Sequence, residues 1–140
     1  MPLLLLLGLL SACLLAPACR APGADAGAPP TGSWRLVELA GSDLATLARA
    51  PELVIEADGK LSGFAGVNRF SGRAVPESLE QGELLAGPLA VTRMAGEPQA
   101  MEVEQRFLEL LGTRLQWRRR GGELEWLAGG DVRARFVAVP

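Results

Sequence analysis

The sequence has no histidine and no tyrosine, and Lys60 is its only lysine. These absences remove the most common general base, the most common metal ligand and most covalent nucleophiles. Catalysis would have to use carboxylates, hydroxyls or Lys60, and no motif places two acids side by side. We therefore expect a protein that is not an enzyme, with no catalytic residue, no cofactor and no bound metal.

Cysteine is also scarce, because Cys13 and Cys19 are the only two and both lie in the apolar N-terminal stretch. The folded part is therefore expected to lack a disulfide, a thiolate metal site and a cysteine nucleophile. A strong excess of charge is missing as well, since the formal net charge is −2. This small charge gives no reason to expect nucleic acid as a partner.

The sequence opens with a run of apolar residues from Leu3 to Leu15. The run is shorter than the roughly 20 residues that span a bilayer, and it fits the apolar core of a secretory signal. Residues 1–18 are therefore predicted to be a signal peptide of the lipoprotein type. Met1-Pro2 supplies no basic segment before the run. The position of the true start codon is therefore left open, and it can lie upstream of Met1.

Two cysteines compete as the site of lipidation. Residues 10–13 (Leu-Ser-Ala-Cys) look more like the bacterial lipobox, whereas residues 16–19 (Ala-Pro-Ala-Cys) give a more usual leader length. We favour Cys19, because two leucines after Cys13 would be an odd start to a tether; Cys13 is the alternative. A plain secretory signal stays open too, since residues 16–18 also suit signal peptidase. The anchor predicts an exported envelope protein, held by its lipid at the outer membrane and facing the periplasm.

Residues 19–32 contain little besides alanine, proline and glycine, so they are predicted to form a disordered tether. Residues 33–140 are expected to fold as one domain. Trp34 and Leu36 alternate there with polar or outward positions, as in a strand with one buried face. Asp43 to Arg49 is predicted to form a short helical turn.

Two hairpins are predicted from complementary cross-strand pairs. A three-residue loop at 57–59 would place Glu56 opposite Lys60. A turn at Gly121-Gly122 would place Arg118 opposite Glu125, and the tryptophans at 117 and 126 opposite each other. The three arginines at 118–120 are therefore interpreted as part of a solvated ladder and not as a surface for nucleic acid.

The last hairpin is predicted to turn through a three-residue loop at 129–131, which sets Glu125 opposite Arg135. Upstream of these strands, residues 78–82 are predicted to be a polar turn. Residues 83–92 are predicted to be extended, with a break at Gly87-Pro88 that indicates an edge or a bulge.

One main helix is predicted from Pro98 to Leu111, because Pro98 suits the first helical position and Gly112 the residue after the end. Its expected apolar stripe includes Met101 and Phe107. Glu104 lies inside this stripe, where a carboxylate is costly unless it is paired. The side chain therefore either reaches water at the margin of the stripe or is a buried partner of Arg93 or Asn68. The expected apolar positions are Ala100, Met101, Phe107, Leu108 and Leu111.

The segment from Gly63 to Gly72 combines three glycines, an asparagine and two phenylalanines within ten residues. Glycines at this density indicate a crowded backbone crossing. A second segment, Thr92 to Gly96, follows downstream.

With these segments in place, the sequence from Ser33 to Val139 resembles the META domain family, the HslJ-like heat-shock proteins of bacterial envelopes. The resemblance rests on Trp34-Arg35-Leu36, the glycine-rich segment, Thr92-Arg93-Met94-Ala95, and Glu104 with Phe107. It implies an α+β, β-rich fold in which an antiparallel sheet curls into a partial barrel around the helix at 98–111. The motif residues that it gives a structural role are Trp34, Gly63, Gly66, Asn68, Phe70, Gly72, Thr92, Arg93, Met94 and Glu104.

The sequence departs from this family at two positions. The family usually has a cysteine where this chain has Val67 and another where it has Gly96, and both are missing. Their joint loss is what we expect if the two positions normally act together, so no redox function is carried over. We expect instead that Asn68, Arg93 and Glu104 form a polar cluster that fastens the helix to the sheet.

Two functions are expected from these observations. The first is a non-enzymatic envelope lipoprotein, a stress-response or protein-interaction module whose partner the sequence does not name. The alternative is a carrier of small hydrophobic ligands in the barrel interior. Its lining would be Trp34, Phe64, Phe70, Trp117 and Trp126, which would otherwise fill the core.

Overall fold

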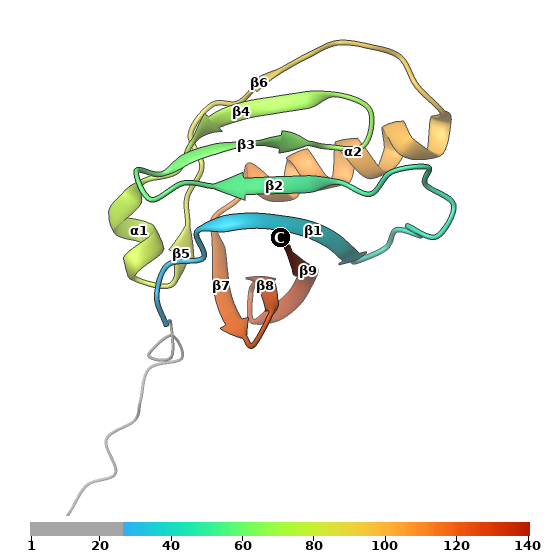
Figure 1. Ribbon diagram of the computed structural model, residues 1–140. Helices are drawn as coiled ribbons and strands as arrows, with labels where there is room; N and C mark the ends of the chain where they lie inside the picture. The colour runs from blue at the N-terminus through green and yellow to red at the C-terminus, as the bar shows by residue number, and fades with distance from the viewer. Residues whose placement is uncertain (1–26) are drawn as a thin grey trace, which may run out of the picture.

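The structure is a computed structural model that describes residues 27–140 (Figure 1). This part of the chain has nine strands and two helices. The strands are β1 (Gly32–Leu39), β2 (Glu52–Ile55), β3 (Lys60–Phe64), β4 (Arg69–Arg73), β5 (Glu83–Leu84), β6 (Ala90–Val91), β7 (Leu115–Arg120), β8 (Glu123–Ala128) and β9 (Asp131–Val139). The helices are α1 (Pro76–Glu80) and α2 (Pro98–Leu111).

All strands belong to one antiparallel sheet in the order β5-β7-β8-β9-β1-β2-β3-β4-β6. The sheet curls into a half-barrel, and α2 lies against its inner side (Figure 1). The expected partial barrel with one main helix is therefore confirmed. The protein is more β-rich than the α+β class suggests, because the second helix has only five residues.

A single segment, residues 83–91, joins the two edges of the sheet. Its first part, β5, pairs with β7, and its last part, β6, pairs with β4. Between them, Ala86 forms a bridge with Ala74, and the Gly87 amide donates to the Arg73 carbonyl over 2.8 Å. The segment therefore passes from one edge to the other directly after Leu84, and the predicted break at Gly87-Pro88 lies beyond this point, between the Ala74–Ala86 bridge and the Ser71–Ala90 pair. We call residues 83–91 the closing segment.

The core fills the space between α2 and the curled sheet. The Phe107 ring contacts Phe70 at 5.7 Å, Trp126 at 5.8 Å and Phe136 at 6.4 Å between centroids. One helical side chain thus touches β4, β8 and β9, which lie in both halves of the sheet. Burying such aromatic area is a large part of the free energy that holds a domain of this size together.

The predicted hairpins have the predicted pairs. Glu56 donates its amide to the Lys60 carbonyl, and Arg118 is opposite Glu125. Trp117 and Trp126 are also opposite each other, as expected. Pairing charge with charge and apolar with apolar therefore found the correct registers.

The last turn differs from the prediction, although the pairs from Trp126 back to Leu124 are the predicted ones. Gly129 and Gly130 form a two-residue turn with φ of 61° and 87°, the left-handed backbone that such tight hairpins need. Ala128 pairs with Asp131 across this turn, and a β-bulge after Trp126 then shifts the register. The bulge, and not a three-residue loop, is what sets Glu125 opposite Arg135.

Three other expectations about local structure were wrong in part. Residues 78–82 are not simply a polar turn, because α1 covers Ser78 to Glu80 and begins with Pro76. Asp43 to Arg49 forms turns and no helix. In α2, whose predicted bounds are confirmed, Met101 is exposed and Val103 is buried instead, so the stripe is rotated from the one expected.

The start of the domain is fixed by Trp34. Its indole N–H donates to the Pro30 carbonyl over 2.8 Å, and Pro30 is itself buried. β1 begins at Gly32, inside the expected tether. The predicted signal peptide, Cys13 and Cys19 lie outside the described residues. Within the described residues, neither helix has the length and apolar character needed to cross a membrane.

Candidate functional site

The most unusual buried group is the Glu104 carboxylate, which lies on α2 among core residues. It is only 6% exposed, and Asn68, in the turn between β3 and β4, is 3% exposed. Neither has a cationic partner among the described residues. Hydrogen bonds link these two side chains to Thr92 and to the backbone of Met94. We call these four residues the Asn68–Glu104 cluster.

Glu104 is held by N–H donors of the β3–β4 turn. Its Oε2 atom accepts from the amides of Val67 (2.8 Å) and Asn68 (2.6 Å), and its Oε1 accepts from Asn68 Nδ2 (2.7 Å). Charge-assisted hydrogen bonds of this kind are stronger than neutral ones and offset the cost of burying a carboxylate. Of the expectations for Glu104, the buried one is therefore confirmed, with Asn68 and not Arg93 as the partner.

Asn68 connects this carboxylate to the segment after β6. Its Oδ1 accepts from the Met94 amide (2.6 Å) and from Thr92 Oγ1 (3.0 Å), while Nδ2 also donates to the Met94 carbonyl (3.1 Å). The side-chain amide thus pairs with the Met94 backbone in the way a neighbouring strand would. Its donors and acceptor are all in use.

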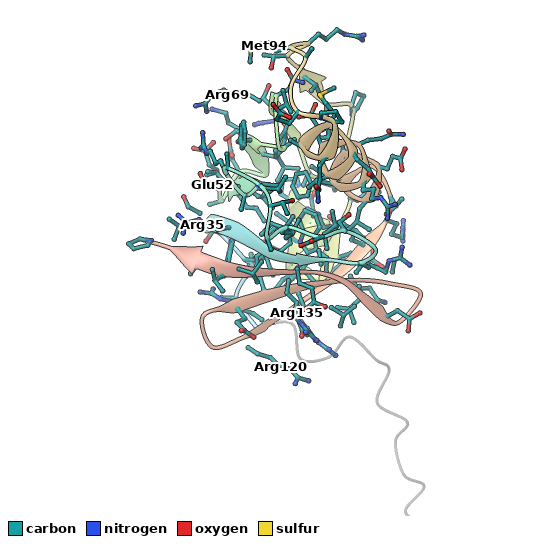
Figure 2. All side chains as sticks on the ribbon, turned by 90° about the vertical axis from the view of Figure 1, so that its right-hand side faces the viewer. Arg35, Glu52, Arg69, Met94, Arg120 and Arg135 are labelled. Carbon is teal, nitrogen blue, oxygen red and sulfur yellow. The ribbon has the colours of Figure 1, made fainter. Side chains whose placement is uncertain are left out.

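Arg93 does not belong to this cluster, which corrects the expectation. Its side chain is exposed, and it has no ion-pair partner among the described residues. The third side chain of the cluster is that of Thr92, which hydrogen-bonds to Asn68, and not that of Arg93. Met94 has a fixed backbone, yet its side chain is 60% exposed and projects at the end of the molecule (Figure 2).

The glycine-rich segment is a crowded crossing, as predicted. A Cβ on Gly63 would overlap the Glu52 carbonyl oxygen, and one on Gly72 would lie 2.6 Å from the Leu89 side chain. Gly66 has φ of 141°, and a Cβ built on it would lie 2.8 Å from the Ala100 carbonyl oxygen of α2. Gly66 therefore lets the turn approach the helix closely enough for Glu104 to reach the turn amides.

Positions 67 and 96 lie in contact. An ideal Cβ on Gly96 would be 3.3 Å from Val67 Cβ and 2.6 Å from its nearer methyl group. This placement agrees with the expectation, drawn from the family resemblance, that the two positions normally act together.

The aromatic side chains that were expected to line a ligand cavity pack against core neighbours or lie outside. Trp34, Phe70, Trp117 and Trp126 are at most 3% exposed. Phe64 is partly exposed on the outer face of the sheet, under the guanidinium of Arg49. The barrel interior therefore has the packing of a core.

A second buried carboxylate, Glu125, lies outside the barrel on β8. It is 6% exposed and accepts hydrogen bonds from Arg118 and Arg135 on the two neighbouring strands. The Arg118 hydrogen bond is the main reason that the pKa of Glu125 is lowered, against the opposing effect of burial. The hydrogen bond that Arg135 donates to Glu125, with Glu38 nearby, raises the pKa of Arg135. Both cross-strand pairs of Glu125 were predicted, but the burial of its carboxylate was not.

The described residues contain no group of three or more cysteine, aspartate or glutamate side chains placed to hold a metal ion. Both oxygens of each buried carboxylate accept hydrogen bonds from N–H groups of the protein. The geometry of the Asn68–Glu104 cluster therefore suits the positioning of backbone: it joins α2, the β3–β4 turn and the segment after β6.

Comparison with known proteins places this geometry in a family. The model of the META domain matches residues 28–139, so the chain belongs to the META domain family. The sequence search of curated proteins gives no match.

Two solved structures share the fold. A protein from Burkholderia xenovorans, solved by NMR, is 22% identical, with a TM-score of 0.64 over 84% of this chain and 88% of that one. A second NMR structure is 26% identical, with a TM-score of 0.61 over 76% of this chain and 88% of its own.

Proposed function

We propose that this META domain protein is a non-enzymatic lipoprotein of the bacterial cell envelope that acts as a protein-interaction or stress-response module. It would be exported and anchored through a lipid on Cys19, or on Cys13, at the outer membrane and facing the periplasm. The apolar leader and the Ala/Pro/Gly-rich segment after it support the anchor.

The observation that carries the interaction role is the state of the buried carboxylates. Glu104 and Glu125 are the buried acids among the described residues, and hydrogen bonds engage both oxygens of each. Carboxylates whose two oxygens both accept N–H groups of the protein serve as structural acceptors that hold neighbouring segments in place. The Asn68–Glu104 cluster fixes the backbone beside exposed side chains, which favours a binding surface over a reaction centre.

Fractionation with matched cysteine variants tests the anchor. We expect the wild-type protein and Cys13→Ser in the membrane fraction, with an acylated N-terminus at residue 19 by mass spectrometry. Cys19→Ser should be found in the soluble fraction. A mature chain that starts beyond residue 19 without lipid, or a cytoplasmic protein, would refute the anchored function.

The stress role is tested by protein abundance before and after heat or envelope stress. We expect a rise under at least one of these conditions. Constant abundance under both would remove the stress role and leave the interaction role to be judged by its own experiment.

A further inference from the structure

The outer face of β2, β3, β4 and β6 is hollowed, with a volume of about 540 Å³. Inward residues of these strands, such as Leu53, Leu61 and Phe70, are buried in the core, so their neighbours in sequence face outward. The floor of the hollow is one row of small side chains. These are cross-strand neighbours, namely Val54, Ser62, Ser71 and Ala90. We call this hollow the outer trough.

One wall of the outer trough carries excess positive charge. Phe64 lies in this wall between its cross-strand neighbours Glu52 and Arg69, and the Arg49 guanidinium is 4.3 Å from its ring centroid. Glu52 forms ion pairs with both Arg49 (3.0 Å) and Arg35 (3.5 Å). Arg69 has no ion-pair partner among the described residues. Figure 2 shows Arg35, Glu52 and Arg69 following one another along this face.

The charged residues beyond the other side of the floor do not line the hollow, and their charges are paired. Lys60 pairs with Glu56 over 3.6 Å, and Arg73 pairs with Asp58 over 3.1 Å. Each of these two cations therefore has its own carboxylate, whereas the lining of the trough has two arginines, Arg49 and Arg69, for the one carboxylate of Glu52. The charge that lacks a partner is concentrated at Arg69.

The Asn68–Glu104 cluster fixes the backbone of Arg69. The Arg69 amide donates to Thr92 Oγ1 (3.1 Å), and the Thr92 amide donates to the Arg69 carbonyl (3.0 Å). Thr92 in turn donates to Asn68 Oδ1. A preorganised backbone lowers the entropy cost of binding, so this arrangement favours recognition at Arg69.

The dimensions of the trough suit an extended chain. Its floor crosses four strands, which are about 4.8 Å apart, and is therefore about 14 Å long. About four residues of extended chain cover this length. The small floor side chains leave room for the residues of such a chain, and the partly exposed Phe64 side chain can pack against an apolar one.

We propose that the outer trough binds an extended acidic segment of another protein, with a carboxylate over Arg69 and an apolar side chain against Phe64. This inference rests on the interaction part of the proposed function. The Phe64 wall supplies the positive charge that such a segment complements, and electrostatic complementarity of this kind governs partner choice.

The test is selection from a random heptapeptide phage library on the purified, immobilised full chain. Selection on Ser71→Trp, which fills the trough, is the matched background. We expect the enriched peptides to contain an acidic residue beside an apolar one. A synthetic copy should bind with an affinity that falls as salt is raised, measured by fluorescence anisotropy.

Two surface variants locate the binding. Arg69→Glu should lower the affinity for the selected peptide by about tenfold or more, because the attraction between Arg69 and the acidic side chain becomes repulsion. Arg120→Glu changes an exposed arginine at the end of β7, away from the trough, and should bind within about twofold of wild type. Circular dichroism melts confirm that each variant is folded.

Several results would overturn the proposal. These are peptides enriched equally on Ser71→Trp, enriched peptides without acidic residues, and equal binding to Arg69→Glu. Arg69-dependent cosedimentation with phosphatidylglycerol vesicles, without peptide binding, would assign the trough to lipid. Dimers that Ser71→Trp dissociates would assign it to a second copy. The purified chain is used throughout, so failure here is distinct from failure of the anchor in cell fractionation.

Discussion

At the scale of single residues, we expect the loss of the Glu104 carboxylate to lower the free energy of unfolding strongly. Glu104→Leu leaves the amides of Val67 and Asn68 and the Asn68 side-chain N–H₂ without their acceptor. Each unsatisfied buried donor costs about 1–3 kcal/mol, so the free energy of unfolding should fall by about 3–5 kcal/mol in urea titrations. Glu109→Leu, on an exposed part of the same helix, is the control and should change it by no more than about 0.5 kcal/mol. Equal effects of the two variants would show that the cluster is only a surface feature.

Glu125 predicts how stability depends on acid. Its pKa is lowered in the folded protein, chiefly by the Arg118 hydrogen bond, so its stabilisation is complete above the ordinary glutamate pKa of about 4.3. That stabilisation is lost as the pH falls through the lower folded pKa. The urea midpoint of Glu125→Gln should therefore be well below wild type at pH 7 and approach it at pH 3. The exposed Glu123→Gln should follow wild type at both pH values, and a constant deficit of Glu125→Gln would contradict the assignment.

The cluster could be predicted only in part from the sequence. Asn68 and Glu104 were found because a carboxylate inside an apolar stripe and an asparagine among glycines both need an explanation. Arg93 was chosen as the third member because a cation is the obvious partner for a buried acid. The structure uses backbone N–H groups for that purpose, and backbone donors are present at every position of a sequence. No sequence signal distinguished the amides of residues 67 and 68 from the others.

At the scale of elements, the contact between the β3–β4 turn and the segment before α2 predicts a new disulfide. Cysteines at 67 and 96 would have Cβ atoms about as close as a disulfide requires, judged from the 3.3 Å between Val67 Cβ and an ideal Cβ on Gly96. Val67→Cys/Gly96→Cys, in a chain with Cys13→Ser and Cys19→Ser, should oxidise. Its free energy of unfolding should then rise by about 3–4 kcal/mol, as expected for a disulfide that closes a loop of this length.

The same double variant under reducing conditions is its own control. Thermal melts with and without dithiothreitol, together with the mass of the intact chain, measure the effect. A double variant that stays reduced in air would mean that the two segments do not approach as described. The Gly96→Ala variant alone should be destabilised, because its Cβ would meet the Val67 methyl groups.

Elements with strong local signals were predictable and short ones were not. The bounds of α2 followed from Pro98 and Gly112, and the hairpin registers followed from pairs such as Arg118 with Glu125. α1 was missed because five residues are too few to show a helical period. The bulge after Trp126 was missed because a two-residue turn with a bulge gives the same later pairs as a three-residue loop. The rotation of α2 that buries Val103 depends on what the helix packs against, which is tertiary information.

At the scale of the whole molecule, the closing segment holds the two edges of the sheet together. Gly87→Pro removes the amide that donates to the Arg73 carbonyl, and should lower the free energy of unfolding by about 2 kcal/mol. Hydrogen exchange should quicken in β5 and β6 together. Gly87→Ala keeps the amide, and its Cβ would be an ordinary 3.6 Å from that carbonyl oxygen, so it should resemble wild type. Equal stability of the two variants would show that closure contributes little.

The pairing of β1 with β9 has a consequence for the order of the chain itself. Ser33 lies opposite Val139, so the beginning and the end of the domain are neighbours in the same ladder. Cutting the chain at Gly129-Gly130 and joining residue 140 to residue 32 by a few glycines would preserve every strand pair. The strand pairing therefore does not depend on where the chain starts and ends. A circular permutant should fold to the same half-barrel.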